Sequence, residues 1–409
     1  MASATETPAY ATRRSRSDAA RKWVEVARSL APLVESEVPQ ASKDTIITPK
    51  VVQAWKDAGL YGVLLPTQFG GAGIDDVTYI EIAEEIARQD ASAGWVYANH
   101  QTGTLFPGML LDEETFRELL GPNGDGIACG FGAPTGPFGT AKRVEGGYLV
   151  QTGPRPFGSG SQHANRVVAR VALIDDNDEM IVGEDGNPEV VYIWVDRNNI
   201  EWLNDWNSSG LAGTGSGSYR VKEHVLEARW MGTDKEIRFS EDPAFAQGFW
   251  PVSGLHHAGV GLGLAKRTLE EIAKSVRGRR RGEVPALDQY PLFLADFVRI
   301  ESEYQAARAF ILDAFRDVWD AAIEGRVAEL HAARIEQANL HLHRALEDIV
   351  STAMLWAGSD VIPKDGIFAR LNANARVAMN HLLVGPQQSI KIAPKLLAAW
   401  QVDGATSAS

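Results

Sequence analysis

Apolar and polar positions divide the chain into a helical first part, a β-rich middle and a helical last part. Over residues 18–126 apolar side chains recur at helical spacing, as Tyr79, Ile82 and Ile86 do on one stripe. Over residues 127–241 short runs rich in β-branched and aromatic side chains alternate with clusters of Gly, Asn and Asp. The middle part is therefore expected to form a small β-barrel or sandwich.

Helical spacing returns over residues 242–400. Phe315 and Val318 share a stripe there, and long helical runs with short connections are typical of an antiparallel bundle. Residues 1–17 and 401–409 lack such a pattern and are expected to be tails. We therefore expect three domains with these boundaries in a mixed, mainly α-helical protein.

The composition is that of an ordinary globular protein whose partners are small molecules. Of the 409 residues 44% are hydrophobic and 23% are charged, and the formal net charge is -13. That charge disfavours nucleic acid and anionic membranes as partners, because both bind basic faces. No apolar run reaches the roughly 18 residues of a membrane span. Cys129 is the only cysteine, so no intrachain disulfide can form and a cytoplasmic location is expected.

Four segments depart from the surrounding helical and strand patterns. The glycine-rich segments GLYGVLLPTQFGGAG (residues 59–73) and GFGAPTGPFG (residues 130–139) break the helical period and predict fixed loops. A third segment, WNSSGLAGTGS (residues 206–216), predicts a turn, and a fourth, NARVAMNH (residues 374–381), ends in a histidine. A glycine lets backbone N–H groups approach a flat ring that a Cβ would keep away.

In this order the segments resemble those of the acyl-CoA dehydrogenase superfamily, and the resemblance extends over almost the whole chain. It implies an N-terminal helical domain, a central β-barrel and a C-terminal antiparallel four-helix bundle. It also implies a flavin cofactor, either FMN or FAD, at a contact between subunits. A homotetramer, or at least a dimer, is therefore expected.

The fourth segment separates two branches of this superfamily. In the dehydrogenases the stretch continues into a turn that supplies a catalytic glutamate in many members, whereas here His381 falls at the tyrosine of that turn and Leu382 at the glutamate. Leucine cannot remove a proton from a thioester substrate. Where other dehydrogenases carry their glutamate, this chain has His256 and His257 and no carboxylate. The segment instead resembles flavin-dependent monooxygenases, which place a histidine there.

The monooxygenase resemblance implies a two-component reaction. A separate flavin reductase would supply reduced FMN or FAD, since the chain carries no nicotinamide fingerprint. Oxygen would add at the flavin C4a atom to give a hydroperoxide, and a small aromatic or polycyclic substrate would receive one oxygen atom. His381 would act as acid or base, Ser159 would contact the N5 edge of the flavin, and His100 is a third catalytic candidate.

Further residues are expected, again by resemblance, to bind the substrate or the flavin. The candidates for substrate contacts are Trp95, Asn99, His100 and His256. The candidates for flavin contacts are Gly130, Phe131, Gly132, Ser159, Gly160, Trp206, Thr214, Arg277 and Arg280.

The two arginines lie in the basic run RGRRRGE (residues 277–283). Such a run is either a solvated face or, by resemblance, the loop that reaches the flavin phosphates of a neighbouring subunit. The aromatic–glycine pair usual in that loop is replaced by Arg281 and Gly282, so the choice between FMN and FAD stays open.

Two other functions stay open on the sequence. A dehydrogenase or oxidase acting on acyl thioesters would need an unrecognised base, such as Asp360 or Asp365. A non-catalytic relative would keep the fold as a binding or assembly module.

Two further patterns have structural explanations. Gly259, Gly261 and Gly263 follow no strand pattern, so we expect them to allow close helix packing rather than to bind a dinucleotide. His341 and His343 are two residues apart on an expected helix and point to nearly opposite sides, so no metal site is expected.

Overall fold

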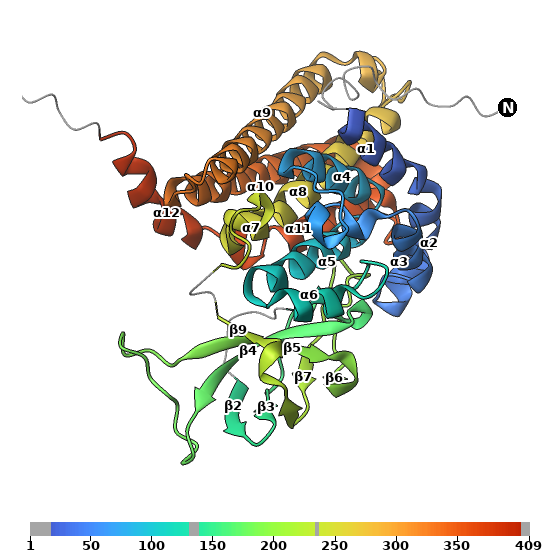
Figure 1. The fold of residues 1–409 in the computed structure, drawn as a ribbon. Coiled ribbons are helices and arrows are strands. Elements are labelled where there is room, and N and C mark those ends of the chain that lie inside the picture. The colour runs from blue at the N-terminus through green and yellow to red at the C-terminus, as the bar shows by residue number, and fades with distance from the viewer. Residues whose placement is uncertain (1–17, 131–138, 234–236, 402–409) are drawn as a thin grey trace, which may run out of the picture.

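A computed structural model describes residues 18–130, 139–233 and 237–401, and Figure 1 shows its helices above a smaller β-domain. The first helices are α1 (Asp18–Ser29), α2 (Ala31–Asp44), α3 (Pro49–Asp57), α4 (Asp76–Gln89), α5 (Ala91–Leu110) and α6 (Glu113–Leu120). The last are α7 (Pro243–Ala246), α8 (Phe249–Ser275), α9 (Pro291–Ile323), α10 (Glu329–Ala357), α11 (Ile367–Ala378) and α12 (Gln387–Ala398). The mainly helical, three-part fold class expected from the sequence is confirmed. None of the described helices is both long enough and apolar enough to cross a membrane.

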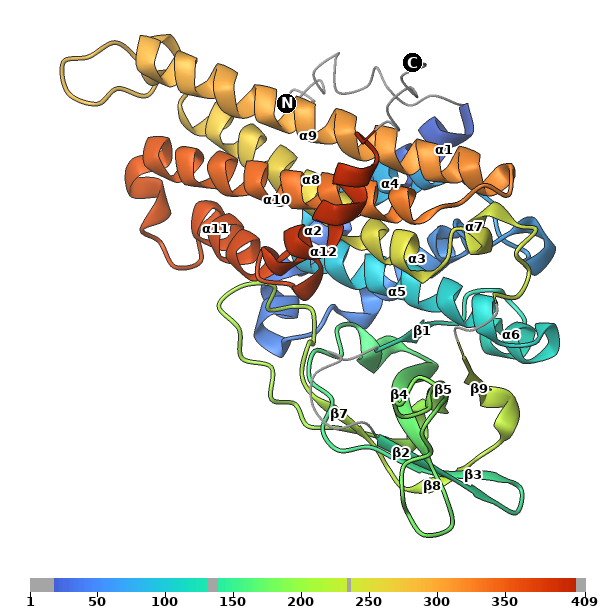
Figure 2. The same ribbon diagram turned by 90° about the vertical axis from the view of Figure 1, so that its left-hand side faces the viewer.

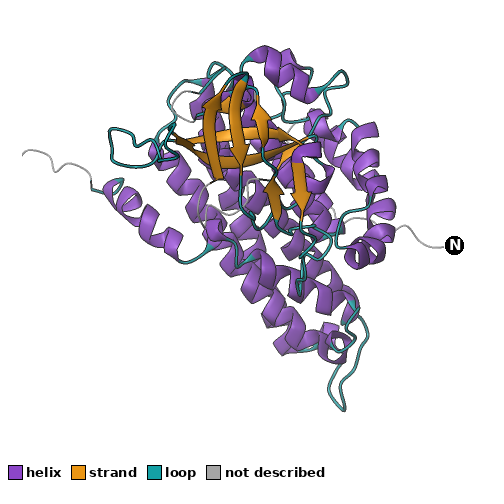
Figure 3. Ribbon diagram, turned by 90° about the horizontal axis from the view of Figure 1, so that it is seen from below, coloured by secondary structure: helices purple, strands orange, loops and turns teal. Residues whose placement is uncertain are grey.

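The β-domain is one curled sheet with a small strand pair beside it, seen from below in Figure 3. Its strands are β1 (Ala128–Cys129), β2 (Gly139–Val144), β3 (Gly147–Gln151), β4 (Arg166–Ile174), β5 (Val190–Asp196), β6 (Ile200–Trp202), β7 (Tyr219–Val221), β8 (His224–Leu226) and β9 (Met231–Gly232). Their order is β8-β3-β2-β4-β5-β9, with β1 pairing with β4, and β6 and β7 pair separately. β8 and β9 are the two edge strands of this sheet. In the described part of the chain they do not pair with each other, so the sheet is an open half-barrel.

Aspartate side chains fix where the helices of the first part begin. Asp75, Asp90 and Asp112 each accept a hydrogen bond from the backbone N–H three residues on, at 2.6, 2.9 and 2.9 Å respectively. Such caps satisfy N–H groups that the first helical turn leaves without partners. Asp90 also ends α4, so α4 and α5 follow each other with a sharp change of direction and share one buried core.

The central helix α8 packs closely against α4 because glycines remove side chains from the contact. A Cβ on Gly259 would lie 2.4 Å from the Cβ of Ala83, and one on Gly263 would lie 2.5 Å from the Cβ of Ala87. Both distances are shorter than any real contact, so only glycine fits. The expected helix-packing role of these glycines is confirmed, and α8 also packs against α5, α10 and α11.

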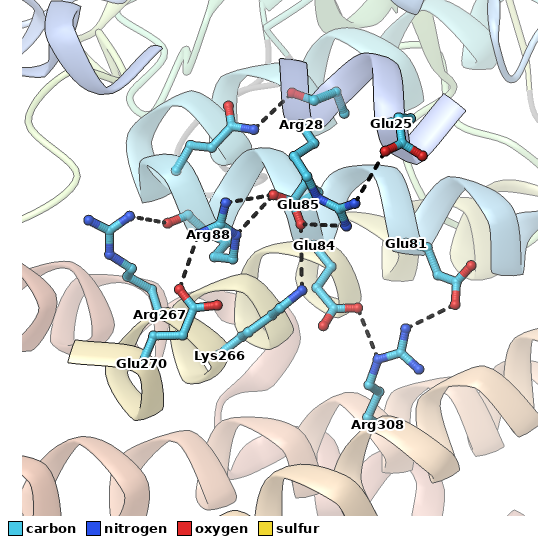
Figure 4. A network of polar contacts seen from close by, with 12 residues as sticks. Glu25, Arg28, Glu81, Glu84, Glu85, Arg88, Lys266, Arg267, Glu270 and Arg308 are labelled. Carbon is cyan, nitrogen blue, oxygen red and sulfur yellow. Dashed lines mark hydrogen bonds and ion pairs between the residues drawn. The ribbon is translucent and has the colours of Figure 1, made fainter. Parts of the chain in front are cut away.

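A buried network of charged side chains joins α4 to α8 and α9 (Figure 4). On α4, Glu84 and Glu81 each accept a hydrogen bond from Arg308 of α9 at 3.0 Å. Burial opposes ionisation of Glu84, but Arg308 and Lys266 outweigh it and hold the pKa of its carboxyl below the usual value. The charges are therefore paired inside the protein, where an unpaired charge would be costly.

We expect Arg308→Met to lower the free energy of unfolding by about 3 to 5 kcal/mol, because it leaves two buried carboxylates without their partner. Arg316→Met is the matched control on the same helix, since Arg316 pairs only with exposed Asp313 among the described residues. It should cost less than about 1 kcal/mol. Urea-denaturation midpoints measure both variants, and equal small losses would show that the network contributes little.

Candidate active site

Three histidines from distant parts of the chain form a row of hydrogen-bonded rings. His257 of α8 lies in the middle, with its Nε2 atom 2.9 Å from Nδ1 of His381, just beyond α11. Its Nδ1 atom lies 3.4 Å from Nε2 of His343 on α10. The Nδ1 atom of His343 lies 2.9 Å from the carbonyl oxygen of Asn339, one turn earlier on the same helix. His257 and His343 are buried, whereas His381 is half-buried at the end of the row.

Trp95 of α5 joins this row to the β-domain. Its ring meets those of His256 and His381 edge-on, with centroids 4.2 and 5.6 Å apart, and its indole N–H donates to the Ser159 hydroxyl at 3.3 Å. The structure thus brings together four residues that the sequence predicted for one site. The half-buried Asn99, also predicted there, donates its side-chain amide to the Trp95 carbonyl one turn back.

Three hydroxyl groups continue from Trp95 into the β-domain. Ser159 and Ser216 lie 2.6 Å apart, Ser216 and Thr214 lie 2.6 Å apart, and the Thr214 hydroxyl bonds the Leu211 carbonyl at 2.8 Å. The carbonyl can only accept, so Thr214 must donate to it, and each earlier hydroxyl must donate to the next. The Ser159 hydroxyl therefore donates its one hydrogen to Ser216, and it can only accept a hydrogen bond from any further partner.

The third and fourth sequence segments meet and fix the position of His381. The Leu211 N–H donates to the Asn374 side-chain oxygen at 2.7 Å. A Cβ on Gly210 would lie 2.1 Å from the carbonyl oxygen of Ala373, so only glycine lets the loop approach α11. Figure 2 shows the yellow-green chain before β7 reaching from the β-domain to this helix. The β-domain therefore contacts the helix that leads to His381.

His100 is placed differently from the other predicted catalytic residues. It is fully buried, and its Nε2 and Nδ1 atoms lie 2.9 Å from the Gly160 carbonyl oxygen and 2.8 Å from the Tyr61 hydroxyl. Burial and then nearby His163 lower the pKa of His100 to about 3, so the ring is neutral. Both ring nitrogens thus have partners, one in the loop that follows Ser159 and the other in Tyr61. The catalytic role of His100 stays a prediction without support from this arrangement.

The remaining residues predicted to contact the flavin lie in different parts of the structure. Trp206 donates its indole N–H to the Leu211 carbonyl at 3.3 Å, which places it beside the hydroxyl groups. Gly130 is buried against Val167 and Ser161, and Phe131 and Gly132 lie outside the described residues. Arg277 and Arg280 are exposed, so a contact with a neighbouring subunit's cofactor stays a prediction.

Burial makes the histidine row electrically neutral near pH 7. It lowers the pKa of His343 and of His381 to about 4, and it lowers the pKa of His256 and of His257 well below the usual value. Near pH 7 each ring therefore has one N–H and one bare nitrogen. A bare nitrogen at a half-exposed position can accept a proton, which is the task of a base.

Sequence reasoning missed several residues of the site. His257 and His343 are central to the row, and Ser216 directs the proton of Ser159. Phe157 holds a left-handed backbone conformation, with φ of 64°, and its side chain is 59% exposed. A bulky residue in that conformation is uncommon, and such residues cluster at functional sites. Two features of the sequence could have indicated these residues. One is the adjacent pair His256 and His257, and the other is the position of Phe157 between a proline and a glycine.

The two carboxylates considered as alternative bases have other surroundings. Asp360 accepts hydrogen bonds from Ser275 at 2.8 Å and from Arg279 at 2.6 Å, and these two partners keep its pKa below the usual value. Asp365 is exposed. Neither has a described contact with Trp95 or His381. Among the described residues no group of three or more His, Cys, Asp or Glu side chains is arranged to hold a metal ion.

Comparison with known proteins identifies the family. The model of the acyl-CoA dehydrogenase N-terminal domain matches residues 16–111, and that of the C-terminal domain matches residues 255–386. The chain is 26% identical over 341 residues to indole-3-acetate monooxygenase from Pseudomonas putida, covering 83% of this chain and 84% of that protein. It is 24% identical over 329 residues to the oxygenase component of the FADH(2)-dependent resorcinol hydroxylase from Rhizobium sp., covering 75% and 73%.

The fold agrees with this assignment. The structure of XiaF from Streptomyces sp. in complex with FADH2 and glycerol superposes with a TM-score of 0.83, at 17% identity, over 93% of this chain and 96% of XiaF. The chain belongs to the acyl-CoA dehydrogenase superfamily, in the branch formed by the oxygenase components of two-component flavin-dependent monooxygenases. The resemblance read from the four sequence segments is thereby confirmed.

Proposed function

We propose that this protein uses reduced FMN or FAD, delivered by a separate reductase, and O2 to oxygenate a small aromatic or polycyclic substrate. The observation that carries the proposal is the position of His381. Its imidazole lies between Trp95 and a row of further imidazoles, and Leu382 beside it has an exposed, non-ionisable side chain. A site with a histidine base and no described carboxylate suits oxygen transfer better than proton removal from a thioester.

The residues present fit a flavin ring. Exposed Phe157 lies two residues before Ser159 and meets Trp206 edge-on, with ring centroids 6.5 Å apart. It offers a flat apolar face, and aromatic faces pack well against other flat rings. Ser159 and Trp206 supply polar groups near that face. Phe157 is therefore added to Ser159, Trp206 and Thr214 as a proposed flavin contact.

The direction of the hydroxyl groups favours the reduced form of the cofactor. Ser159 donates to Ser216, so its remaining lone pair accepts. The N5 atom of a flavin carries a hydrogen only when the flavin is reduced, and an acceptor on the protein suits that form. Reduced flavin, when bound, supplies the two electrons that activate O2.

The protein's own residues would orient and deprotonate the substrate. Trp95 and His256 form a wall of packed rings beside His381, and such a wall would exclude water from a bound substrate. The bare nitrogen of His381 would take a proton from an acidic O–H or N–H of the substrate. Support for an aromatic substrate comes from the relatives whose names specify indole-3-acetate and resorcinol. The name "oxygenase component" of one relative supports a separate reductase as partner.

We expect His381→Ala to reduce product formation by about 100-fold or more, the usual effect of losing a general acid or base. Indole-3-acetate and resorcinol serve as probe substrates, with chemically reduced FMN or FAD and O2. Binding of reduced flavin should persist, and the oxygen consumed should appear as hydrogen peroxide.

His341→Ala is the control, because His341 is half-buried on α10 near Phe310 and away from the row. It should keep the activity of the unmodified protein. Full product formation by His381→Ala would remove His381 from the site while leaving the class of enzyme unchanged.

We also propose that the protein is a homotetramer, or at least a dimer. The exposed apolar side chains on α9, α10 and α12 include Leu292, Val298, Leu355, Ile390 and Leu397. Large apolar side chains left exposed on helices that pack against each other support a surface that a partner covers.

Light scattering should therefore give four times, or at least twice, the mass of one chain. Val298→Glu should shift the protein toward smaller species, because it places a charge on the proposed contact. Val182→Glu is the control, since Val182 is exposed on the β-domain between β4 and β5. A monomer at working concentration would contradict the proposal.

A further inference from the structure

The three rings of the histidine row have a fixed set of hydrogen-bond partners at both ends. At one end the Leu383 N–H donates to Nδ1 of His381 at 3.2 Å. At the other end the Asn339 carbonyl can only accept, so Nδ1 of His343 must carry a hydrogen. His257 lies between them with both nitrogens in contact with neighbouring rings.

Three neutral rings cannot satisfy all of these contacts. If Nδ1 of His381 accepts from Leu383, then His257 must donate to it, and the bare nitrogens of His257 and His343 face each other. The other neutral arrangement places a hydrogen on Nδ1 of all three rings and gives up only the Leu383 contact. That arrangement leaves Nε2 of His381 bare, and this atom has no partner among the described residues.

One additional proton removes every contact between two bare nitrogens or between two N–H groups. A proton bound at Nε2 of His381 lets its Nδ1 hydrogen pass to Nε2 of His257, and the Nδ1 hydrogen of His257 then passes to Nε2 of His343. Each ring gains one N–H bond and loses another, except His343, which ends with two and carries the positive charge. The lone pair on the bare Nδ1 of His381 is now shared between the His257 Nε2–H and the Leu383 N–H.

We propose that His257 and His343 form a proton relay that takes the proton accepted by His381 and stores it on His343, beside the Asn339 carbonyl. This inference rests on the proposed function of His381 as the base. The substrate's O–H or N–H bond breaks, its electron pair stays on the substrate, and the proton moves inward by the two transfers described. It returns along the same path when the product is protonated.

No other described titratable side chain is hydrogen-bonded to the three rings of the relay. The charges that act on these rings within the described residues are those of the rings themselves and of His256. The His256 ring lies nearly parallel to that of His381, at 14°, with centroids 6.4 Å apart. It therefore has no hydrogen bond to the row, and its Nε2 is buried without a described partner. His256 shapes the wall and is not a member of the relay.

The relay is tested in the unloaded protein by ¹⁵N NMR of labelled histidines, which distinguishes Nδ1–H, Nε2–H and doubly protonated rings. At pH 8 we expect His257, His343 and His381 to be neutral Nδ1–H rings, although the Nε2–H form is the usual one for free histidine. As the pH falls, His343 should be the first of them to carry two hydrogens, while His381 changes to Nε2–H.

Two substitutions of His343 separate hydrogen bonding from proton storage. The amide of Gln in His343→Gln can still accept from His257 and donate to Asn339, so the tautomers should persist at pH 8. Because Gln cannot take a proton, His257 should then be the ring that first carries two hydrogens, and at a lower pH. In His343→Phe no acceptor remains, so His257 and His381 should change to Nε2–H already at pH 8. His341→Gln, on the same helix, should change neither result.

Three outcomes would overturn the relay. They are Nε2–H on His257 and His381 in the unmodified protein, a first proton on His381 instead of His343, or His343→Phe with unchanged tautomers. Thermal denaturation checks that each variant is folded. Because the spectra need no flavin, they test the relay even where the monooxygenase assay fails, and failure of that assay alone would count against the proposed function.

Discussion

The close contact between α8 and α4 is the constraint on which the site depends. Gly259 and Gly263 bring the two helices together at distances that no side chain allows, and buried ion pairs from α4 hold α9 against the same region. This contact fixes the rotation of α8 about its axis. His257 therefore faces α10 and the end of α11, and His256 faces Trp95, with no freedom to exchange places.

The chemistry follows from hydrogen-bond direction more than from any single residue type. In the β-domain a carbonyl that can only accept orients three hydroxyl groups in sequence and leaves Ser159 as an acceptor. In the helical bundle another carbonyl fixes a hydrogen on Nδ1 of His343, and the proposed arrangement of the row leaves Nε2 of His381 bare. Trp95 separates the two systems and contacts both. The proposed site thus has the acceptor Ser159 on one side of Trp95 and the proposed base His381 on the other.

The sequence predicted the fold well because periodicity reports burial. The β-rich region expected over residues 127–241 contains the strands β1 to β9, and the stripe of Tyr79, Ile82 and Ile86 is buried on α4. His341 and His343 point to different neighbours, as their spacing predicted. Of the expected site, His381, Ser159, Trp95 and His256 do lie together.

The rest depends on contacts between segments far apart in the chain. His257 and His343 lie 86 positions apart and have no local pattern that distinguishes them from core histidines. The role of Ser216 depends on which hydroxyl donates, which spacing cannot reveal. His100 resembled a cavity residue in sequence, but Tyr61 and Gly160 occupy both of its ring nitrogens.

The most direct test of the central claim is an anaerobic titration of the protein with FMN and FAD in both oxidation states. A site whose hydroxyl accepts from N5 should bind reduced flavin about tenfold more tightly than oxidised flavin, the scale of one hydrogen bond gained and one repulsion removed. Equal or tighter binding of oxidised flavin, followed by bleaching of that flavin on addition of an acyl-CoA, would contradict the account and indicate a dehydrogenase.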